Sequence, residues 1–233
     1  MLRAMSRIAT LAALFLLAAC AASNQATEPT DAGHGIALPP GKAAAVLGLT
    51  TVTPPHAELT GVEFNTYLYW ITYDPASRRR VGQAALRSRI GCDFLSKCSP
   101  VIDNVQYQLY LVDPGSYAVS GIQYGTLYDI DPTRPDDHPP LQTVAPSFTV
   151  APGEVAYVGN LVVDFGKTWW IGWSAEQDAA AARAFLAPTG LADRLLVRPM
   201  LRVDGTPINP TDGVPARPPR RSLEMPLFIP GKH

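Results

Sequence analysis

The chain has 233 residues, with 19 Lys and Arg against 20 Asp and Glu, a formal net charge of −1, and 47% hydrophobic residues. This length favours one domain, and the hydrophobic content is sufficient for a packed core. A chain this close to neutral lacks the positive field that gathers nucleic acid, so we expect no nucleic-acid partner.

Residues 1–19 have the features of a signal peptide. Arg3 and Arg7 form a basic start, and the apolar run that follows is short for a membrane span. The run closes with Leu17-Ala18-Ala19-Cys20, which resembles the lipobox of bacterial lipoproteins. The resemblance implies that Cys20 becomes the lipidated first residue, with several acyl chains, palmitate among them, holding the protein to the bilayer. The alternative is an ordinary secreted protein cleaved after Ala19 or Ala22.

The residues after Cys20 indicate which membrane the protein is anchored to and how its domain is connected to the anchor. Ala21 stands where lipoproteins retained in the inner membrane generally carry aspartate, so the resemblance implies the periplasmic side of a Gram-negative outer membrane. Residues 20–41 are rich in small and polar residues, Gly and Pro, with no apolar periodicity. Such a segment buries too little surface to offset its ordering entropy, so we expect a flexible tether.

Residues 42–203 are expected to form the folded domain. Apolar and polar residues alternate from Gly61 to Tyr73, which predicts a strand that ends at Asp74-Pro75. Arg78, Arg79 and Arg80 then form a dense basic run. We interpret it as a solvated loop; the alternative is contact with anionic headgroups or an acidic envelope polymer.

Cys92 and Cys98 are the thiols left once Cys20 is lipidated. They lie six residues apart in an oxidising compartment, which favours a local disulfide. A redox-active pair normally has closer spacing beside a helix start, and a zinc site needs more ligands than these two residues offer. We therefore expect a stapled loop and no metal or other cofactor.

Two Pro-Gly pairs, Pro114-Gly115 and Pro152-Gly153, each precede a β-favouring run that carries a tyrosine, Tyr117 or Tyr157. Proline followed by glycine suits a type II turn, so each pair predicts a corner that starts a strand. Between the corners, residues 129–140 hold four prolines and four aspartates. The ordered spacing of a calcium loop is missing, so we expect a solvated excursion that could carry a partner site.

Two β-favouring runs flank Gly166-Lys167 and predict a hairpin. Trp169 and Trp173 would share one strand face, with Trp170 on the other. We expect the first face to pack under the following helix. The alternative is an aromatic platform for sugar rings, with Arg78, Arg79 and Arg80 as accompanying ligand residues. Stacking on a sugar ring would require that these tryptophans be exposed.

A helix is expected over residues 175–187. Ser174 suits its N-cap, Gln177 completes a capping box, and Pro188 ends it. Residues 204–233 are rich in proline and read as a loop-like tail. The fold class predicted is therefore mainly β: an antiparallel β-sandwich with one appended C-terminal helix.

The run Phe148-Thr149-Val150-Ala151-Pro152-Gly153-Glu154-Val155-Ala156-Tyr157-Val158-Gly159, with the earlier corner and the lipobox, resembles a family of uncharacterised bacterial lipoproteins called DUF2846-like. It is also similar to transthyretin-like and carboxypeptidase-regulatory β-sandwiches. These resemblances cover residues 105–173 and imply a small sandwich without catalytic residues. The proline-rich insertion and the helix after the hairpin depart from that pattern.

The motifs of common enzymes are missing: there is no Gly-x-Ser-x-Gly elbow, phosphate-binding glycine loop or HExxH. We therefore expect a membrane-tethered periplasmic lipoprotein with a non-enzymatic binding or assembly role, partnered by the bilayer and by an envelope protein or glycan. A glycan- or peptidoglycan-binding module is the first alternative, and an envelope hydrolase is the second.

Overall fold

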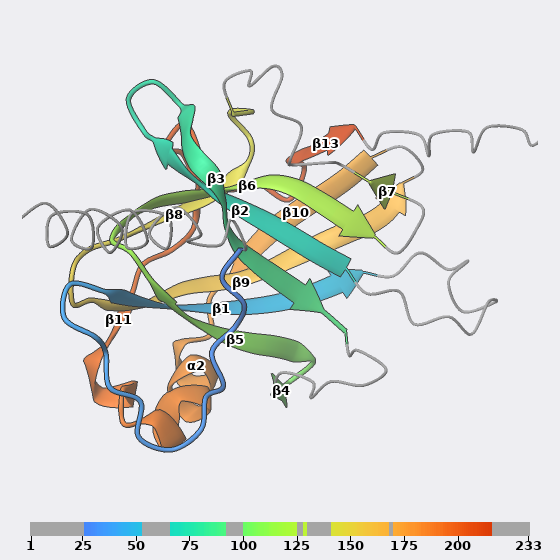
Figure 1. Cartoon of the computed structure of the whole chain (residues 1–233). Helices are drawn as coiled ribbons and strands as arrows, with labels where there is room; N and C mark the ends of the chain where they lie inside the picture. Colours follow the sequence, from blue (N-terminus) through green and yellow to red (C-terminus); the bar gives the residue numbers. More distant parts are fainter. Residues whose placement is uncertain are drawn as a thin grey trace, which may run out of the picture.

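The computed structural model describes residues 26–52, 66–91, 100–124, 128–129, 141–167 and 170–215. Two β-sheets pack face to face, and helix α2 lies against the outer face of one sheet (Figure 1). The prediction of a mainly-β sandwich with a helix in its C-terminal part is confirmed.

The first sheet is mixed. Its order is β13-β10-β9-β1-β5-β4, and β11 also pairs with β9, which makes seven strands in the described ranges. Strand β1 is antiparallel to β5 but parallel to β9, so this sheet departs from the purely antiparallel arrangement expected. Its strands are β1 (Ala43–Val52), β4 (Val101–Ile102), β5 (Val105–Val112), β9 (Val155–Lys167), β10 (Trp170–Glu176), β11 (Leu195–Val197) and β13 (Gly213–Pro215).

The second sheet is antiparallel. Its order is β12-β8-β6-β2-β3, with β7 paired to β6, and it has six strands among the residues described. Its strands are β2 (Thr66–Asp74), β3 (Arg79–Ile90), β6 (Gly115–Tyr124), β7 (Tyr128–Asp129), β8 (Pro146–Val150) and β12 (Leu201–Arg202). Strand β3 therefore forms one edge of this sheet.

Strand β1 shows why the mixed sheet is apolar on both faces. Its residues Ala43, Ala45, Leu47 and Leu49 lie in the core between the sheets, whereas the residues between them face the helix side. A strand covered on both faces needs a continuous apolar run rather than alternation. The sequence from Ala43 to Leu49 meets this requirement.

Helix α2 (Ala179–Leu186) is followed by two 3₁₀ turns, η2 (Ala187–Thr189) and η3 (Ala192–Arg194). The predicted start of the helix is wrong. Ser174 lies in β10, and Asp178 is the N-cap, with its carboxylate accepting a hydrogen bond from the Ala181 amide at 2.9 Å. Phe185 and Leu186 are buried against the mixed sheet.

The two corner tyrosines are structural. Tyr117 is 2% exposed, and its hydroxyl donates to the carbonyl of Asp113 at 2.6 Å. Tyr157 is fully buried; its hydroxyl donates to Asn160 Oδ1 at 2.8 Å and accepts from the Asp178 amide at 2.9 Å. Tyr117 therefore closes the first corner, and Tyr157 joins β9 to the start of α2.

The second corner is a turn of the expected type. Gly153 has φ of 74°, and the Glu154 amide donates to the Ala151 carbonyl at 3.2 Å. The Glu154 carboxylate is buried, accepts from the Ala151 amide at 2.8 Å and pairs with Arg198 at 2.6 Å. This glutamate therefore stabilises its own turn and holds the segment after β11.

The predicted hairpin is present as β9 and β10, which pair antiparallel. Lys167 pairs with Trp170, so Gly166-Lys167 belongs to β9 rather than to the turn. The tail also differs from expectation, because β13 within residues 204–233 pairs with β10. Pairing to an existing strand orders a segment that has little apolar content of its own.

The segment that leads into β1 is bound to the domain from Thr27 onward. Thr27 and Thr30 form backbone hydrogen bonds with β3 and β5, and the amides of Gly35 and Ile36 donate to η2. Figure 1 shows this segment in blue, running past β5 to α2 before it returns to β1. The structure thus differs from a tether that is flexible over all of residues 20–41; residues 20–25 lie outside the described ranges.

Side chains of β5 close the edge of β3. Gln108 donates to the Arg89 carbonyl and accepts from the Arg89 amide, and Gln106 forms the same pair of bonds with Gly91. The Tyr110 hydroxyl adds bonds to the Arg87 carbonyl and to Gln108. These amides act as substitutes for a neighbouring strand, and we call this contact the glutamine seam.

We expect Gln108→Ala to lower the free energy of unfolding by about 2–3 kcal/mol, because it removes the side chain that bonds both backbone groups of Arg89 and takes one partner from the buried Tyr110 hydroxyl. Urea unfolding measures this effect. The exposed Gln142→Ala is the control and should change stability by no more than about 0.5 kcal/mol. Equal stability of the two variants would contradict a structural role for the seam.

Burial raises the pKa of Tyr117 to about 12. The unfolded chain releases this proton near pH 10, so unfolding becomes easier as the pH rises from about 10 towards 12. Tyr117→Phe should lower stability by about 1 kcal/mol at pH 7, through loss of the hydrogen bond to Asp113, and should make the alkaline decline shallower. Urea midpoints between pH 8 and 11.5 test this, and an unchanged alkaline slope would count against it.

Candidate functional site

The lipidation and disulfide candidates, Cys20, Cys92 and Cys98, lie outside the described residues, so both assignments stay predictions. Of the predicted proline-rich excursion at residues 129–140, only the backbone of Asp129, in β7, is described.

The three consecutive arginines lie at the connection between β2 and β3. Arg78 has φ of 55° and its amide donates to the Asp74 carbonyl at 2.7 Å, which closes the turn. Arg79 is exposed and Arg80 is half-buried. The three side chains therefore differ in exposure, and their role as ligand residues stays a prediction.

The tryptophan candidates differ in what the structure describes. Trp173 is 3% exposed and its indole donates to the Val144 carbonyl at 3.0 Å, so it is unavailable to a ligand. Together with Ile171 it packs in the core between the sheets, not under α2 as expected. Trp169 is outside the described residues, as is the side chain of Trp170.

A different aromatic and basic cluster stands on the outer face of the antiparallel sheet. Tyr67 pairs with Arg89 across β2 and β3, and Tyr69 pairs with Arg87. Because Leu68, Leu86 and Ser88 point into the core, these four residues point outward. We call Tyr67, Tyr69, Arg87 and Arg89 the tyrosine–arginine face. All four are half-buried.

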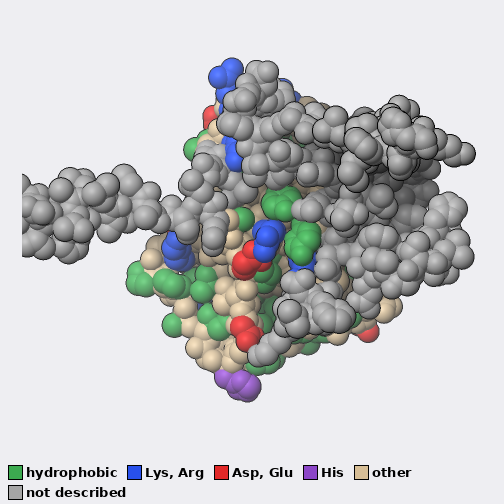
Figure 2. Space-filling view, turned by 45° about the vertical axis from the view of Figure 1, so that its right-hand side comes forward, with side chains coloured by type: hydrophobic (Ala, Val, Ile, Leu, Met, Phe, Trp, Pro, Cys, Tyr) green, Lys and Arg blue, Asp and Glu red, His purple; other side chains and the backbone are tan. Residues whose placement is uncertain are grey.

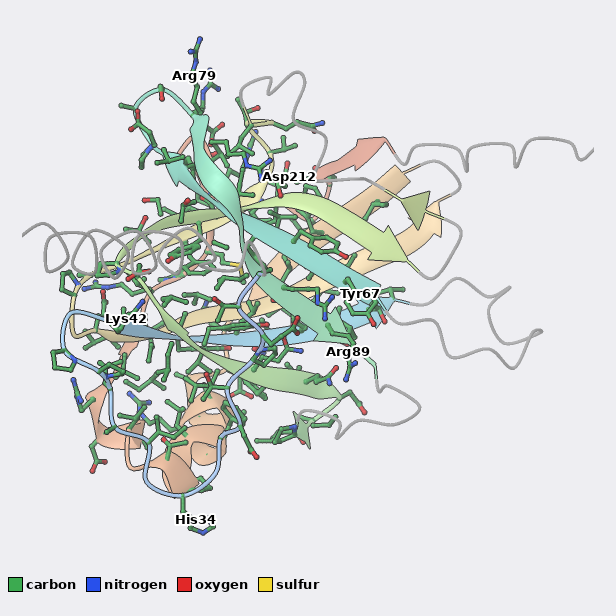
Figure 3. All side chains as sticks on the ribbon, in the orientation of Figure 1. His34, Lys42, Tyr67, Arg79, Arg89 and Asp212 are labelled. Atoms are coloured by element: carbon green, nitrogen blue, oxygen red, sulfur yellow. The ribbon has the colours of Figure 1, made fainter. Side chains whose placement is uncertain are left out.

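Figure 3 places this face within the fold. Tyr67 and Arg89 lie together at one end of the sheet, and Arg79 lies at the other end. The register agrees, since Arg79 pairs with Asp74 at the far end of β2. Arg79 of the arginine run thus lies away from this cluster, and β10, which carries Trp170 and Trp173, belongs to the other sheet.

Arg87 has the most completely defined environment of the four. Its guanidinium carbon lies 5.3 Å from the centre of the Tyr67 ring, a cation–π distance. Its Nη2 lies 2.7 Å from Glu28 Oε1 in the N-terminal segment. Its Nε is buried and has no hydrogen-bond partner among the residues that the structure describes. The Glu28 carboxylate thus uses one donor of the guanidinium edge that bidentate carboxylates use.

The glutamine seam supports the face from behind. Bonds from Gln108 and Tyr110 fix the backbone of Arg89 and Arg87. Burial raises the pKa of Tyr110, so its hydroxyl stays protonated and available as a donor. On the other side, Gly121 of β6 pairs with Tyr69 and leaves that flank without a side chain. Hydrogen bonds thus hold the backbone that carries the face, and one flank of Tyr69 has a glycine beside it.

Basic and acidic side chains are interspersed on the surface. Figure 2 shows a face on which Lys and Arg side chains lie apart, beside acidic and hydrophobic side chains, rather than in one basic patch. Within the described ranges, no group of three or more His, Cys, Asp or Glu side chains could hold a metal ion, and no helix is long and apolar enough to cross a membrane. The tyrosine–arginine face can therefore offer aromatic rings for stacking and guanidinium groups that donate hydrogen bonds to an anion.

The comparisons identify no relative. The chain matches no protein-family model, no curated protein and no solved structure. The resemblance to DUF2846-like and transthyretin-like proteins therefore stays a prediction, and any function has to be argued from the residues themselves.

The tyrosine–arginine face was not among the predicted sites. A strand was expected from Gly61 to Tyr73, but its pairing with β3 was not predicted. The available signal was the alternation of Leu86, Arg87, Ser88 and Arg89, which is typical of a half-buried strand.

Proposed function

We propose that the chain is a lipid-anchored protein of the periplasmic face of the outer membrane, and that its β-sandwich binds an anionic glycan of the envelope without catalysing a reaction. The anchor is Cys20, on the evidence of the lipobox-like Leu17-Ala18-Ala19-Cys20. The binding surface is the tyrosine–arginine face.

The observation that carries the binding proposal is the geometry at Arg87. One guanidinium stacks on Tyr67 and bonds a carboxylate at 2.7 Å, so the surface already holds an anion next to an aromatic ring. A carboxylated sugar polymer presents the same two features, a ring face and an acid group. Peptidoglycan, with acidic stem peptides on its sugars, is the envelope polymer of this chemistry that a periplasmic domain meets.

The repeat of tyrosine–arginine pairs along the face supports a polymer as ligand. Tyr67 and Tyr69 lie two residues apart on β2, and each is paired with an arginine on β3. Side chains two residues apart on one strand face are about 7 Å apart. The face therefore repeats one tyrosine–arginine unit along the strand, which suits an extended chain rather than a single small molecule.

Replacing Cys20 by Ala should move the protein from the membrane fraction to the soluble periplasmic fraction, because an anchored chain depends on its acyl groups for stable attachment. Cell fractionation followed by immunoblotting measures this, with the wild-type protein as reference. A membrane fraction that is unchanged in the variant would refute the anchor.

Combined Arg87→Ala and Arg89→Ala changes should weaken binding to purified peptidoglycan sacculi by about tenfold, since hydrogen bonds to charged groups contribute about 1.5–3 kcal/mol. Co-sedimentation measures the bound fraction. Arg79→Ala is the matched control, because it removes an exposed arginine from the same strand. Binding that is indifferent to the double change, or binding to anionic phospholipid vesicles in place of sacculi, would overturn the proposal.

A further inference from the structure

The described part of the N-terminal segment begins beside the tyrosine–arginine face. The Thr27 amide donates to the Ala85 carbonyl at 2.9 Å, and the Thr27 carbonyl accepts from the Arg87 amide at 3.1 Å. Thr30 donates to the Leu109 carbonyl at 2.7 Å. Glu28 lies between these two attachment points, and its carboxylate is thereby delivered to the Arg87 side chain.

At this end the described part of the docked segment is held by backbone hydrogen bonds and an ion pair. Beyond Thr30, the apolar residues Ala32, Ile36 and Leu38 pack against the core on the helix side. Around Glu28, by contrast, the ion pair is half-exposed, with 42% of the Arg87 side chain and 54% of the Glu28 side chain accessible. Exposed ion pairs are weak, so a competing anion can replace this one.

The pairing is also incomplete. Glu28 engages Nη2 of Arg87, whereas the buried Nε on the same edge of the guanidinium has no hydrogen-bond partner in the described part of the chain. A carboxylate that bonds both donors would satisfy a group that Glu28 leaves unsatisfied. An external acid therefore has a bond available to it that the internal one does not make.

We infer that Glu28 is an internal substitute for the ligand's carboxylate, so that binding of an acidic glycan and docking of the first residues of the N-terminal segment compete for Arg87. This inference rests on the proposed function of the tyrosine–arginine face. It adds that the face is partly occupied before ligand arrives, by the segment that leads to the anchor.

Isothermal titration of the full chain with soluble peptidoglycan fragments bearing free stem-peptide carboxylates tests the competition. Glu28→Gln should bind about threefold to fivefold more tightly than wild type, which is the factor that an exposed ion pair of up to about 1 kcal/mol represents. Asp31→Asn is the matched control: it removes an exposed carboxylate from the same segment and should leave the affinity unchanged.

Amide hydrogen exchange gives a second readout that a change in affinity alone does not provide. Adding the fragments to wild-type protein should accelerate exchange of the Arg87 amide, which donates to Thr27, because the segment loosens when its glutamate is displaced. Equal affinities of wild type and Glu28→Gln, with unchanged exchange, overturn the competition and leave the binding site intact. Absence of binding by both proteins overturns the proposed function and this inference together.

Discussion

The glutamine seam is the contact on which the rest of the molecule depends. An edge strand exposes backbone donors and acceptors, and inside a packed protein these groups need partners. Gln106 and Gln108 supply them from β5, so the two sheets are joined by hydrogen bonds along one side as well as by apolar packing. Gln108 also fixes the backbone of Arg89, and the Tyr110 hydroxyl bonds that of Arg87, which links the stability of the sandwich to the position of these two residues.

Much of the architecture could be predicted because it depends on local chemistry. The Pro152-Gly153 turn follows from the backbone preferences of its two residues, and the run after it, which carries Tyr157, forms β9 as predicted. The start of α2 could not be predicted in this way. Ser174 has the chemistry of an N-cap, but the strand continues to Glu176 because β10 pairs with β9, and that pairing is a tertiary contact.

The candidate site was harder to predict than the fold, because it requires the register of β2 against β3. That register shifts on either side of Ile71. Each shift of one residue exchanges the two faces of a strand, so alternation alone cannot say which arginines stand opposite Tyr67 and Tyr69. Three consecutive arginines are easily recognised in a sequence. The arginines that pair with tyrosines are instead single residues in an alternating strand.

Docking of the N-terminal segment also sets the length of free chain between Cys20 and the folded domain. If Cys20 is the lipidated residue, Thr27 follows it by seven residues, which span at most about 25 Å of extended chain. Release of the segment up to Lys42 would lengthen this free chain to at most about 75 Å. With an anchor at Cys20, the docked segment would keep the domain within the shorter of these two distances from the bilayer, and a ligand that releases the whole segment would extend that distance about threefold.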